Sequence, residues 1–170
     1  SDLLSGGEPY VYPLTPRTRY LVELEEIPAA VLPRVRLVYL NYPNNPTAAI
    51  APMEYLERTV AFCRRHGIVL AYDNPYCDLT FDGYRAPSIF EIPGAREVAI
   101  EYFSLSKSFS MTGWRLGWAA AEKRFITALT RPPPRDRSSD LMKSSASSRR
   151  KTRPQERPTG CGLSRIRRPV

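Results

Sequence analysis

The sequence predicts an α/β fold with a mostly parallel sheet, and three apolar runs are the main evidence for it. Residues 36–40, 68–72 and 98–103 are short, continuous and rich in β-branched and aromatic residues, as buried strands are. A helical pattern separates the first two runs, and about two dozen residues separate the second from the third. Parallel neighbours need crossovers of such lengths, so we expect all three strands to run in the same direction.

The segment before the first strand is expected to be a connection with one short helix. Residues 1–35 contain five prolines. The only helical spacing there is a weak one, formed by Leu21, Leu24, Ile27 and Val31. The first strand then ends at residues 41–47, where asparagine and proline predominate and predict a turn.

A helix is predicted between the first two strands. Pro52 suits its first turn, and Gly67 ends its pattern. The apolar residues at helical spacing, which we expect to face the core, are Met53, Leu56, Val60 and Cys63. Strand, helix and strand then form a right-handed βαβ unit. His66 falls at the helix C-terminus, where an imidazole interacts favourably with the carbonyl ends, and we assign it no catalytic role.

Turn signals and spacing predict the remaining elements. Asp82-Gly83 marks a turn, and residues 87–93 leave room for a short helical piece. A polar loop then extends from residue 104 to 113, and residues 115–120 regain strand character. This return is too short for a helical crossover, so the fourth strand should be antiparallel to a neighbour. Residues 122–129 can begin a helix.

The net charge of +8 is distributed very unevenly along the 170 residues. Residues 1–130 carry 13 basic and 14 acidic side chains and all 18 aromatic residues. Residues 131–170 carry 12 basic and 3 acidic side chains, with 6 prolines and 7 serines. A segment of this composition cannot offset its ordering entropy by burial. We therefore predict a folded region over 1–130 and a disordered basic tail over 131–170. The abrupt change also suggests that the tail is an out-of-frame translation or a gene-model error.

Composition disfavours several classes of protein. No stretch approaches the roughly 18 apolar residues of a membrane span, and the N-terminus lacks a signal-like pattern, so we expect a cytoplasmic protein. Cys63, Cys77 and Cys161 form no paired motif, and with a single histidine they predict neither a metal site nor a disulfide framework. The basic tail could bind nucleic acid, but it has no aromatic stacking platform, and we expect no nucleic-acid partner.

Distinctive polar residues follow the three parallel strands. Asn45 follows the first strand, and Asp73 and Tyr76 follow the second. After the third strand come Ser104, Ser106 and Lys107. Ligands of open parallel sheets bind outside the carboxyl ends of the strands, so these side chains should converge on one crevice.

Four motifs in this order resemble the large domain of class I/II aminotransferases, which depend on pyridoxal 5′-phosphate (fold type I). They are Asn44-Asn45-Pro46-Thr47, Asp73-Asn74-Pro75-Tyr76, Ser104-Leu105-Ser106-Lys107, and Arg115 eight positions after that lysine. The resemblance covers roughly residues 10–130 and implies part of a three-layer α/β/α domain. Residues 39–46, 81–88 and 104–115 look most like LL-diaminopimelate aminotransferases and neighbouring aspartate or alanine aminotransferases.

The resemblance implies a role for each residue of the predicted site. Lys107 resembles the lysine that bonds to the cofactor aldehyde and moves a proton at the substrate α-carbon. Asp73 resembles the carboxylate that pairs with the protonated pyridine nitrogen. Taken alone, a lysine in a loop is more often solvated than catalytic, whereas Asp73 at the end of an apolar strand is less often a turn or helix-capping residue than a functional one.

The other predicted residues would bind the cofactor through hydrogen bonds. Asn45 and Tyr76 resemble the pair that contacts its phenolic oxygen, although singly they could be a turn residue and a core residue. Ser104 and Arg115 resemble the phosphate ligands, and Ser106 is assigned to the same anion site.

The implied reaction transfers an amino group between an amino acid and a 2-oxo acid, in a homodimer. A C–S lyase using the same cofactor site is the alternative enzyme. Ala48 stands where the family commonly has glycine, which predicts a slightly different turn. The family's upstream phosphate loop, its ring-stacking aromatic residue and its carboxylate-binding arginine have no counterpart. We therefore expect the polypeptide as written to be an inactive fragment.

Overall fold

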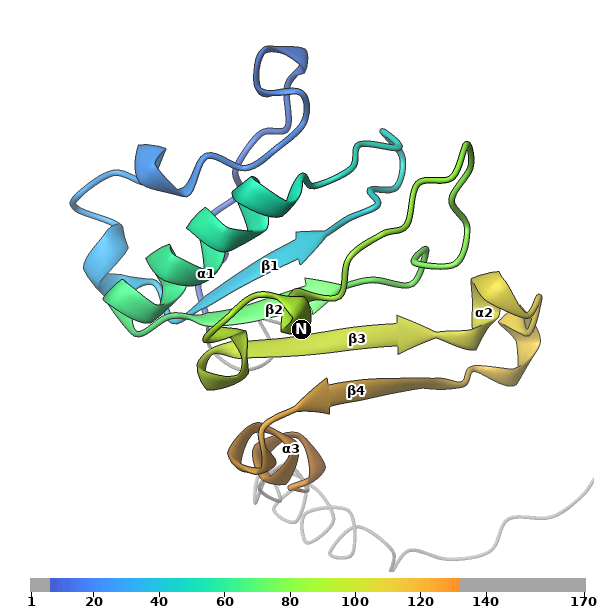
Figure 1. Ribbon diagram of the computed structural model, residues 1–170. Coiled ribbons are helices and arrows are strands. Elements are labelled where there is room, and N and C mark those ends of the chain that lie inside the picture. The colour runs from blue at the N-terminus through green and yellow to red at the C-terminus, as the bar shows by residue number, and fades with distance from the viewer. Residues whose placement is uncertain (1–6, 132–170) are drawn as a thin grey trace, which may run out of the picture. The chain divides into compact units, whose positions relative to one another are not determined.

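The computed structural model describes residues 7–131, and every structural statement below concerns that range. Its centre is a four-stranded sheet in the order β1-β2-β3-β4 (Figure 1). The strands are β1 (Leu37–Asn41), β2 (Val69–Asp73), β3 (Ala99–Ser104) and β4 (Gly117–Ala121). The first three are parallel, and β4 is antiparallel to β3. The predicted mixed α/β fold with a mostly parallel sheet is therefore confirmed.

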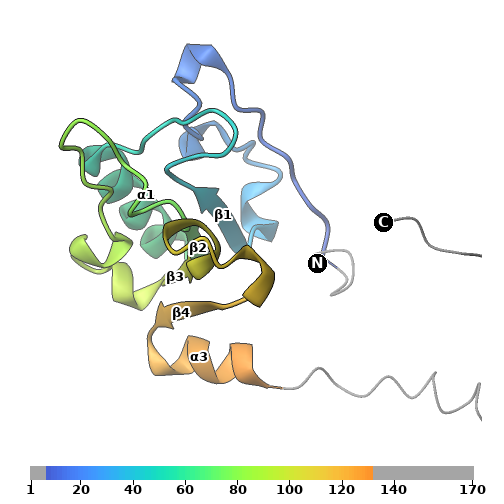
Figure 2. The ribbon, with the colours of Figure 1, turned by 90° about the vertical axis from the view of Figure 1, so that its right-hand side faces the viewer.

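Helix α1 (Met53–His66) connects β1 to β2 and covers one face of the sheet (Figure 2). It ends as predicted, because Gly67 adopts φ 64° and its N–H bonds back to the last turn. Leu56, Val60 and Cys63 are buried as expected. Met53 was wrongly assigned to the core: it is 38% exposed because it begins the helix, where the chain enters from the surface.

From residue 7 to β1 the chain contains no α-helix, which corrects the expectation of a single helix there. Three short 3-10 turns lie in this described part of the segment: η2 (Pro16–Thr18), η3 (Leu24–Glu26) and η4 (Leu32–Arg34). Pro28 and Pro33 interrupt the weak helical pattern, because proline lacks an N–H and clashes with the preceding turn of a helix. The segment still packs on the core through Leu21 and Leu24, which are buried.

Strand β1 is buried on one side only, although its apolar run predicted burial on both. Val38 and Leu40 belong to the core, whereas Leu37 and Tyr39 are 48% and 59% exposed. Successive side chains of a strand point to opposite faces, and α1 covers one of them. The apolar residues at 37 and 39 lie on the other face.

The connections contain several short helical pieces. Asp82 and Gly83 form the predicted turn, with φ values of 56° and 75°. The expected helical piece before β3 is η5 (Ile89–Glu91), and η6 (Ala95–Glu97) follows it. The predicted polar loop after β3 contains α2 (Leu105–Ser108) and η7 (Thr112–Trp114). Helix α3 (Lys123–Thr130) confirms the last predicted element.

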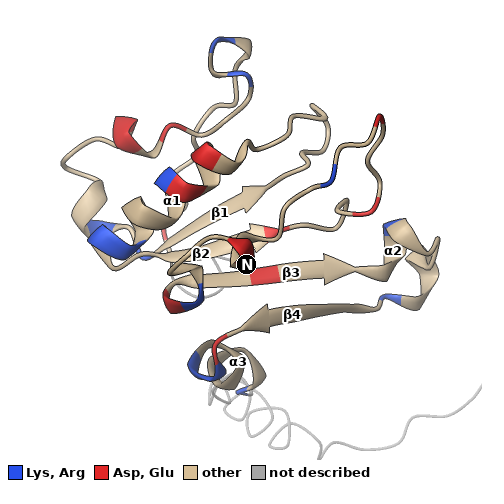
Figure 3. Ribbon diagram, viewed as in Figure 1, with Lys and Arg blue, Asp and Glu red and all other residues tan. Residues whose placement is uncertain are grey.

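Charged residues of both signs are interspersed along α1 and the connecting loops (Figure 3). No helix within residues 7–131 is long and apolar enough to cross a membrane. The predicted basic tail lies outside the described residues except for Arg131.

Candidate cofactor site

The carboxyl ends of β1, β2 and β3 lie at one edge of the sheet (Figure 1). The parallel register pairs Asn41 with Asp73 and Asp73 with Tyr102. Every loop that leaves this edge carries at least one of the predicted residues. The topology therefore brings the predicted residues to the same side of the molecule, as expected of an open parallel sheet.

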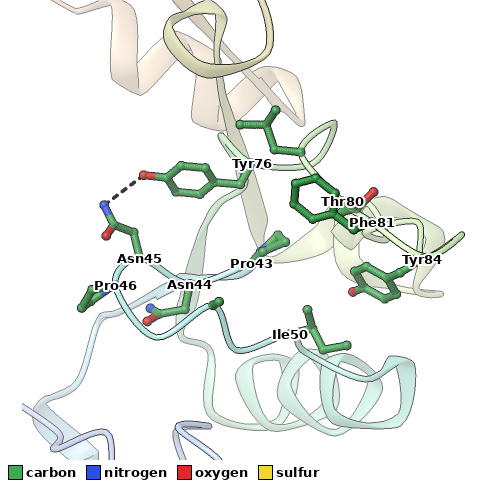
Figure 4. A pocket seen from close by; sticks show the side chains of 11 residues that line it. Pro43, Asn44, Asn45, Pro46, Ile50, Tyr76, Thr80, Phe81 and Tyr84 are labelled. Atoms are coloured by element: carbon green, nitrogen blue, oxygen red, sulfur yellow. Dashed lines mark hydrogen bonds between the residues drawn. The ribbon is translucent and has the colours of Figure 1, made fainter.

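Asn45 and Tyr76 contact each other directly, from the loops that follow β1 and β2 (Figure 4). The Asn45 amide Nδ2 donates a hydrogen bond of 3.0 Å to the Tyr76 hydroxyl. Asn41, the last residue of β1, orients this loop by accepting a hydrogen bond from the Asn45 backbone N–H at 3.1 Å. The two side chains predicted to bind one cofactor oxygen are thus already paired.

The turn after Asn45 is closed by backbone hydrogen bonds and contains a strained alanine. The N–H of Ala48 donates to the Asn44 carbonyl at 2.8 Å, and the N–H of Asn44 donates to the Ala49 carbonyl at 2.9 Å. Ala48 adopts φ 56°, a conformation that glycine accepts far more readily. The turn therefore contains a left-handed residue that carries a side chain.

Lys107 lies on α2, immediately after the carboxyl end of β3. The Ser104 hydroxyl caps this short helix by accepting a hydrogen bond from the Ser106 N–H at 3.2 Å. The Lys107 ammonium lies 5.7 Å from the centre of the Tyr76 ring, within the range of a cation–π contact. Lys107 is exposed and pairs with no carboxylate among the described residues. Its amine is therefore free to bond to a ligand.

Asp73 ends β2 and is held by neutral donors from β1. The Tyr39 hydroxyl donates to Asp73 Oδ2 at 2.7 Å, and the Asn41 amide makes a longer contact of 3.5 Å to the same oxygen. Partial burial and the hydrogen bond to Asp73 raise the pKa of Tyr39, so this phenol remains a donor at neutral pH. No Lys or Arg in the range 7–131 forms an ion pair with Asp73.

Tyr39 and Asn41 were not predicted to be part of the site. A signal was present, because residues 39 and 41 share one face of a strand, and a parallel register brings that strand's end beside Asp73. Using this signal requires the register, which the sequence does not specify by itself.

Arg115 is the predicted residue that the structure ties least to the others. It precedes β4 and adopts φ 53°, so the strand begins at Gly117 and not at the expected residue 115. Its guanidinium donates to the Thr112 carbonyl at 3.4 Å. Within the described chain it bonds to neither Ser104 nor Ser106, and no carboxylate neutralises it.

A cavity of about 560 Å³ adjoins the Asn45–Tyr76 pair (Figure 4). Its walls come from the loop after β1 and from the loop 74–88, and they include Ile50, Phe81 and Tyr84. Of the predicted site residues, only Asn45 and Tyr76 line it. The described residues contain no cluster of His, Cys, Asp and Glu that could hold a metal ion.

The side chains of Lys107, Asp73 and Arg115 fit a ligand that combines an aldehyde, a cationic ring nitrogen and a phosphate. Lys107 offers an amine, and Asp73 offers a carboxylate without a cationic partner among residues 7–131. Arg115 offers an unneutralised guanidinium, which suits a phosphate. Pyridoxal phosphate has all three groups, so the residues present are compatible with it.

Comparison with known proteins gives a consistent match. The sequence model of the family described as "Aminotransferase class I and II" matches residues 3–135. The LL-diaminopimelate aminotransferase 2 of Trichormus variabilis is 45% identical over 130 residues, which are 76% of this chain and 33% of that protein. The LL-diaminopimelate aminotransferase of Moorella thermoacetica is 47% identical over 129 residues, with the same coverage of both chains.

The solved structures include similar folds. A probable N-succinyldiaminopimelate aminotransferase from Thermus thermophilus superimposes with a TM-score of 0.69 at 37% identity. The match covers 74% of this chain and 33% of that one. The chain therefore spans about a third of the length of the relatives it matches.

Proposed function

The chain belongs to the class I and II aminotransferases, and we propose that it supplies the pyridoxal phosphate site of an enzyme that transfers an amino group between an amino acid and a 2-oxo acid. Members of this family use that cofactor. The observation that carries the proposal is the contact between Asn45, Tyr76 and Lys107 at the carboxyl edge of the sheet. This contact forms only when the segments that follow β1, β2 and β3 fold together.

The carboxylate of Asp73 would hold the cofactor ring. The hydrogen bond from the Tyr39 hydroxyl fixes the position of one of its oxygens. When bound, pyridoxal phosphate supplies an aldehyde for the amino group and a ring that accepts electrons. A fixed negative charge beside the ring nitrogen keeps that nitrogen protonated, which is the form that accepts electrons best.

Lys107, Tyr76 and Asn45 would act around the aldehyde. The Lys107 amine would bond to it and, once released, carry a proton to and from the substrate α-carbon. The Tyr76 ring lies beside this group and attracts its protonated form by a cation–π contact. Tyr76 already accepts a hydrogen bond from Asn45, so its own hydroxyl proton is free to be donated to a cofactor oxygen.

Ser104, Ser106 and Arg115 would bind the phosphate. The Ser104 hydroxyl holds the first turn of α2, and Ser106 lies next to Lys107 on the same turn. Arg115 supplies the positive charge. The Arg115 side chain would have to leave the Thr112 carbonyl to reach the anion, because that carbonyl is the only acceptor it has within the described range.

The names of the relatives support LL-diaminopimelate as the amino donor. They also support transamination over C–S lysis. A homodimer, expected from the resemblance, and a cytoplasmic location, expected from composition, remain part of this proposal.

A chimeric enzyme tests the proposal. Residues 10–130 of this chain would replace the matching segment of the Moorella thermoacetica relative, which is 47% identical. We expect the chimera to transfer an amino group from LL-diaminopimelate to a 2-oxo acid. Lys107→Ala should reduce this rate by at least about a hundredfold, the usual loss of a general base.

Two results would contradict the proposal. One is a folded chimera whose turnover does not depend on Lys107. The other is a chimera that releases sulfur from cysteine conjugates and transfers no amino group. A Lys123→Ala chimera is the matched control, because Lys123 is also an exposed lysine but lies on α3.

A further inference from the structure

We propose that Glu101 is a positioning residue whose buried carboxylate joins the two ends of the loop 74–88 and thereby holds Tyr76 in the site. This inference rests on the proposed function of Tyr76 and deepens it. Glu101 lies in the middle of β3 and is the single acidic position within that strand (Figure 3).

The two ends of the loop bind different oxygens of the same carboxylate. Asn74, the first residue after β2, donates from Nδ2 to Glu101 Oε1 at 2.9 Å. Ser88, just before η5, donates from its hydroxyl to Glu101 Oε2. Glu101 is 0% exposed and Asn74 is 1% exposed, so water does not compete for these contacts. The loop therefore begins beside one oxygen of the carboxylate and ends beside the other, so that Glu101 holds both of its ends.

The orientation of the Asn74 amide is determined by its neighbours. Its Nδ2 faces two acceptors, Glu101 Oε1 and the Pro87 carbonyl, the latter at 3.4 Å. A flipped amide would place its oxygen against both of them. In the observed orientation Asn74 Oδ1 has no partner, and it is the one buried side-chain polar atom in the described range that lacks one. The Asn74 NH₂ group thus donates to the base of the loop, while the Asn74 oxygen is left without a hydrogen bond.

The partners of Glu101 do not neutralise its charge. None of the ion pairs in the described range includes Glu101. Burial raises the pKa of Glu101, while Asn74, Ser88 and the Ile89 backbone oppose this shift. For stability alone, a well-packed apolar residue often serves as well as a buried charge. What the carboxylate adds is two acceptors on one rigid group of the central sheet.

The two hydrogen bonds that Asn74 and Ser88 donate to Glu101, together called the joint, determine where Tyr76 lies. Tyr76 is two residues beyond Asn74, and its hydroxyl and ring contact Asn45 and Lys107. The returning end of the loop is rigid as well, because Ser88 forms a capping box with Glu91. If either hydrogen bond to Glu101 is lost, the loop is anchored at one end only and Tyr76 is free to leave its partners.

Hydrogen exchange on the 170-residue chain without cofactor tests the joint directly. In Glu101→Gln, one carboxylate oxygen becomes an NH₂ group and the negative charge is lost, so either the Asn74 amide faces a donor or the Ser88 hydroxyl must change from donor to acceptor. We expect the loop amides of Leu79 and Tyr84, which are hydrogen-bonded within the loop, to exchange at least about tenfold faster, the usual effect of losing a hydrogen bond to a charged group. Amides of β2 should keep their rates. Equal acceleration in β2 and in the loop, or none in the loop, would overturn the proposal.

Matched variants separate the joint from general destabilisation. Ser88→Ala, which removes the cap of η5 together with the hydrogen bond to Glu101, should reproduce the loop acceleration. Ser88→Thr, which keeps the hydroxyl for both contacts, should retain slow exchange. Both remain informative if Glu101→Gln fails to fold. Glu97→Gln is the control for the same chemical change, because Glu97 is exposed and pairs with Arg64.

A second readout connects the joint to the site. Pyridoxal phosphate trapped at Lys107 by borohydride should require a several-fold higher concentration in Glu101→Gln and Ser88→Ala than in the parent chain. Unchanged trapping alongside faster loop exchange would overturn the positioning role. Absence of trapping in the parent chain would refute the proposed cofactor site, and the exchange rates would still decide whether Glu101 joins the loop.

Discussion

Replacing Ala48 by glycine should raise the free energy of unfolding, although an alanine-to-glycine change inside a helix or strand usually lowers it. Ala48 adopts φ 56°, and the left-handed region costs an L-residue about 1–2 kcal/mol. Glycine removes this strain but loses about 0.5–1 kcal/mol through its more flexible unfolded state. The Ala48 side chain is exposed, so little burial is lost. The difference lies between about 0 and 1.5 kcal/mol, so we expect a net gain of about 0.7 kcal/mol in the free energy of unfolding.

Urea unfolding followed by circular dichroism measures this difference. Ala61→Gly is the matched control, because Ala61 is an exposed residue inside α1. There the same change should lower the free energy of unfolding by about 1 kcal/mol. Opposite signs for the two variants are the expected result. If Ala48→Gly destabilises as much as Ala61→Gly, the left-handed turn after Asn45 is not the conformation of the folded chain.

Three further predictions concern glycine and cysteine residues. A Cβ at Gly117 would lie 2.6 Å from the Phe103 carbonyl oxygen, so Gly117→Ala should destabilise the chain by about 1–3 kcal/mol in thermal unfolding. Gly113→Ala is the control: its Cβ would meet open space, and the change should have little effect. In the folded chain at pH 8, iodoacetamide should modify Cys77 long before Cys63, because Cys63 is completely buried and Cys77 is not. Peptide mapping measures the two rates, and equal rates would contradict the described core. Burial raises the pKa of Cys63 from 9.0 to about 12, so the stability that its protonated thiol contributes should be fully present below pH 9 and lost as the pH rises toward 12; urea unfolding across this range should show a smaller loss in Cys63→Ala.

Elements of the sheet could be predicted because their signals are local. Each parallel strand is a short apolar run that ends at a turn or a polar residue, and α1 is bounded by Pro52 and Gly67. The N-terminal segment was misread because four apolar residues at helical spacing were given more weight than Pro28 and Pro33. The exposure of Leu37 and Tyr39 depends on what covers each face of the sheet, which no local pattern of β1 reveals.

The candidate site was predictable where its residues follow strand ends. Asn45, Asp73 and Lys107 each belong to a short motif with a recognisable position after a strand. Tyr39 and Glu101 were not predicted because each lies within an apolar run, where the sequence indicates only a buried strand. Their contacts depend on the register of β1 against β2 and on the return of the loop 74–88 over β3. Such pairings arise from tertiary packing and have no signature in the local sequence.

The most direct test of the account is a covalent trap of the cofactor. The 170-residue chain is incubated with pyridoxal phosphate and reduced with borohydride, and the modified peptide is identified by mass spectrometry. We predict a stable label on the peptide that contains Lys107, absent in Lys107→Ala and retained in Lys123→Ala. A chain that takes up no label, or one whose labelling is unchanged when Lys107 is removed, would contradict the assignment of this sheet edge as the cofactor site.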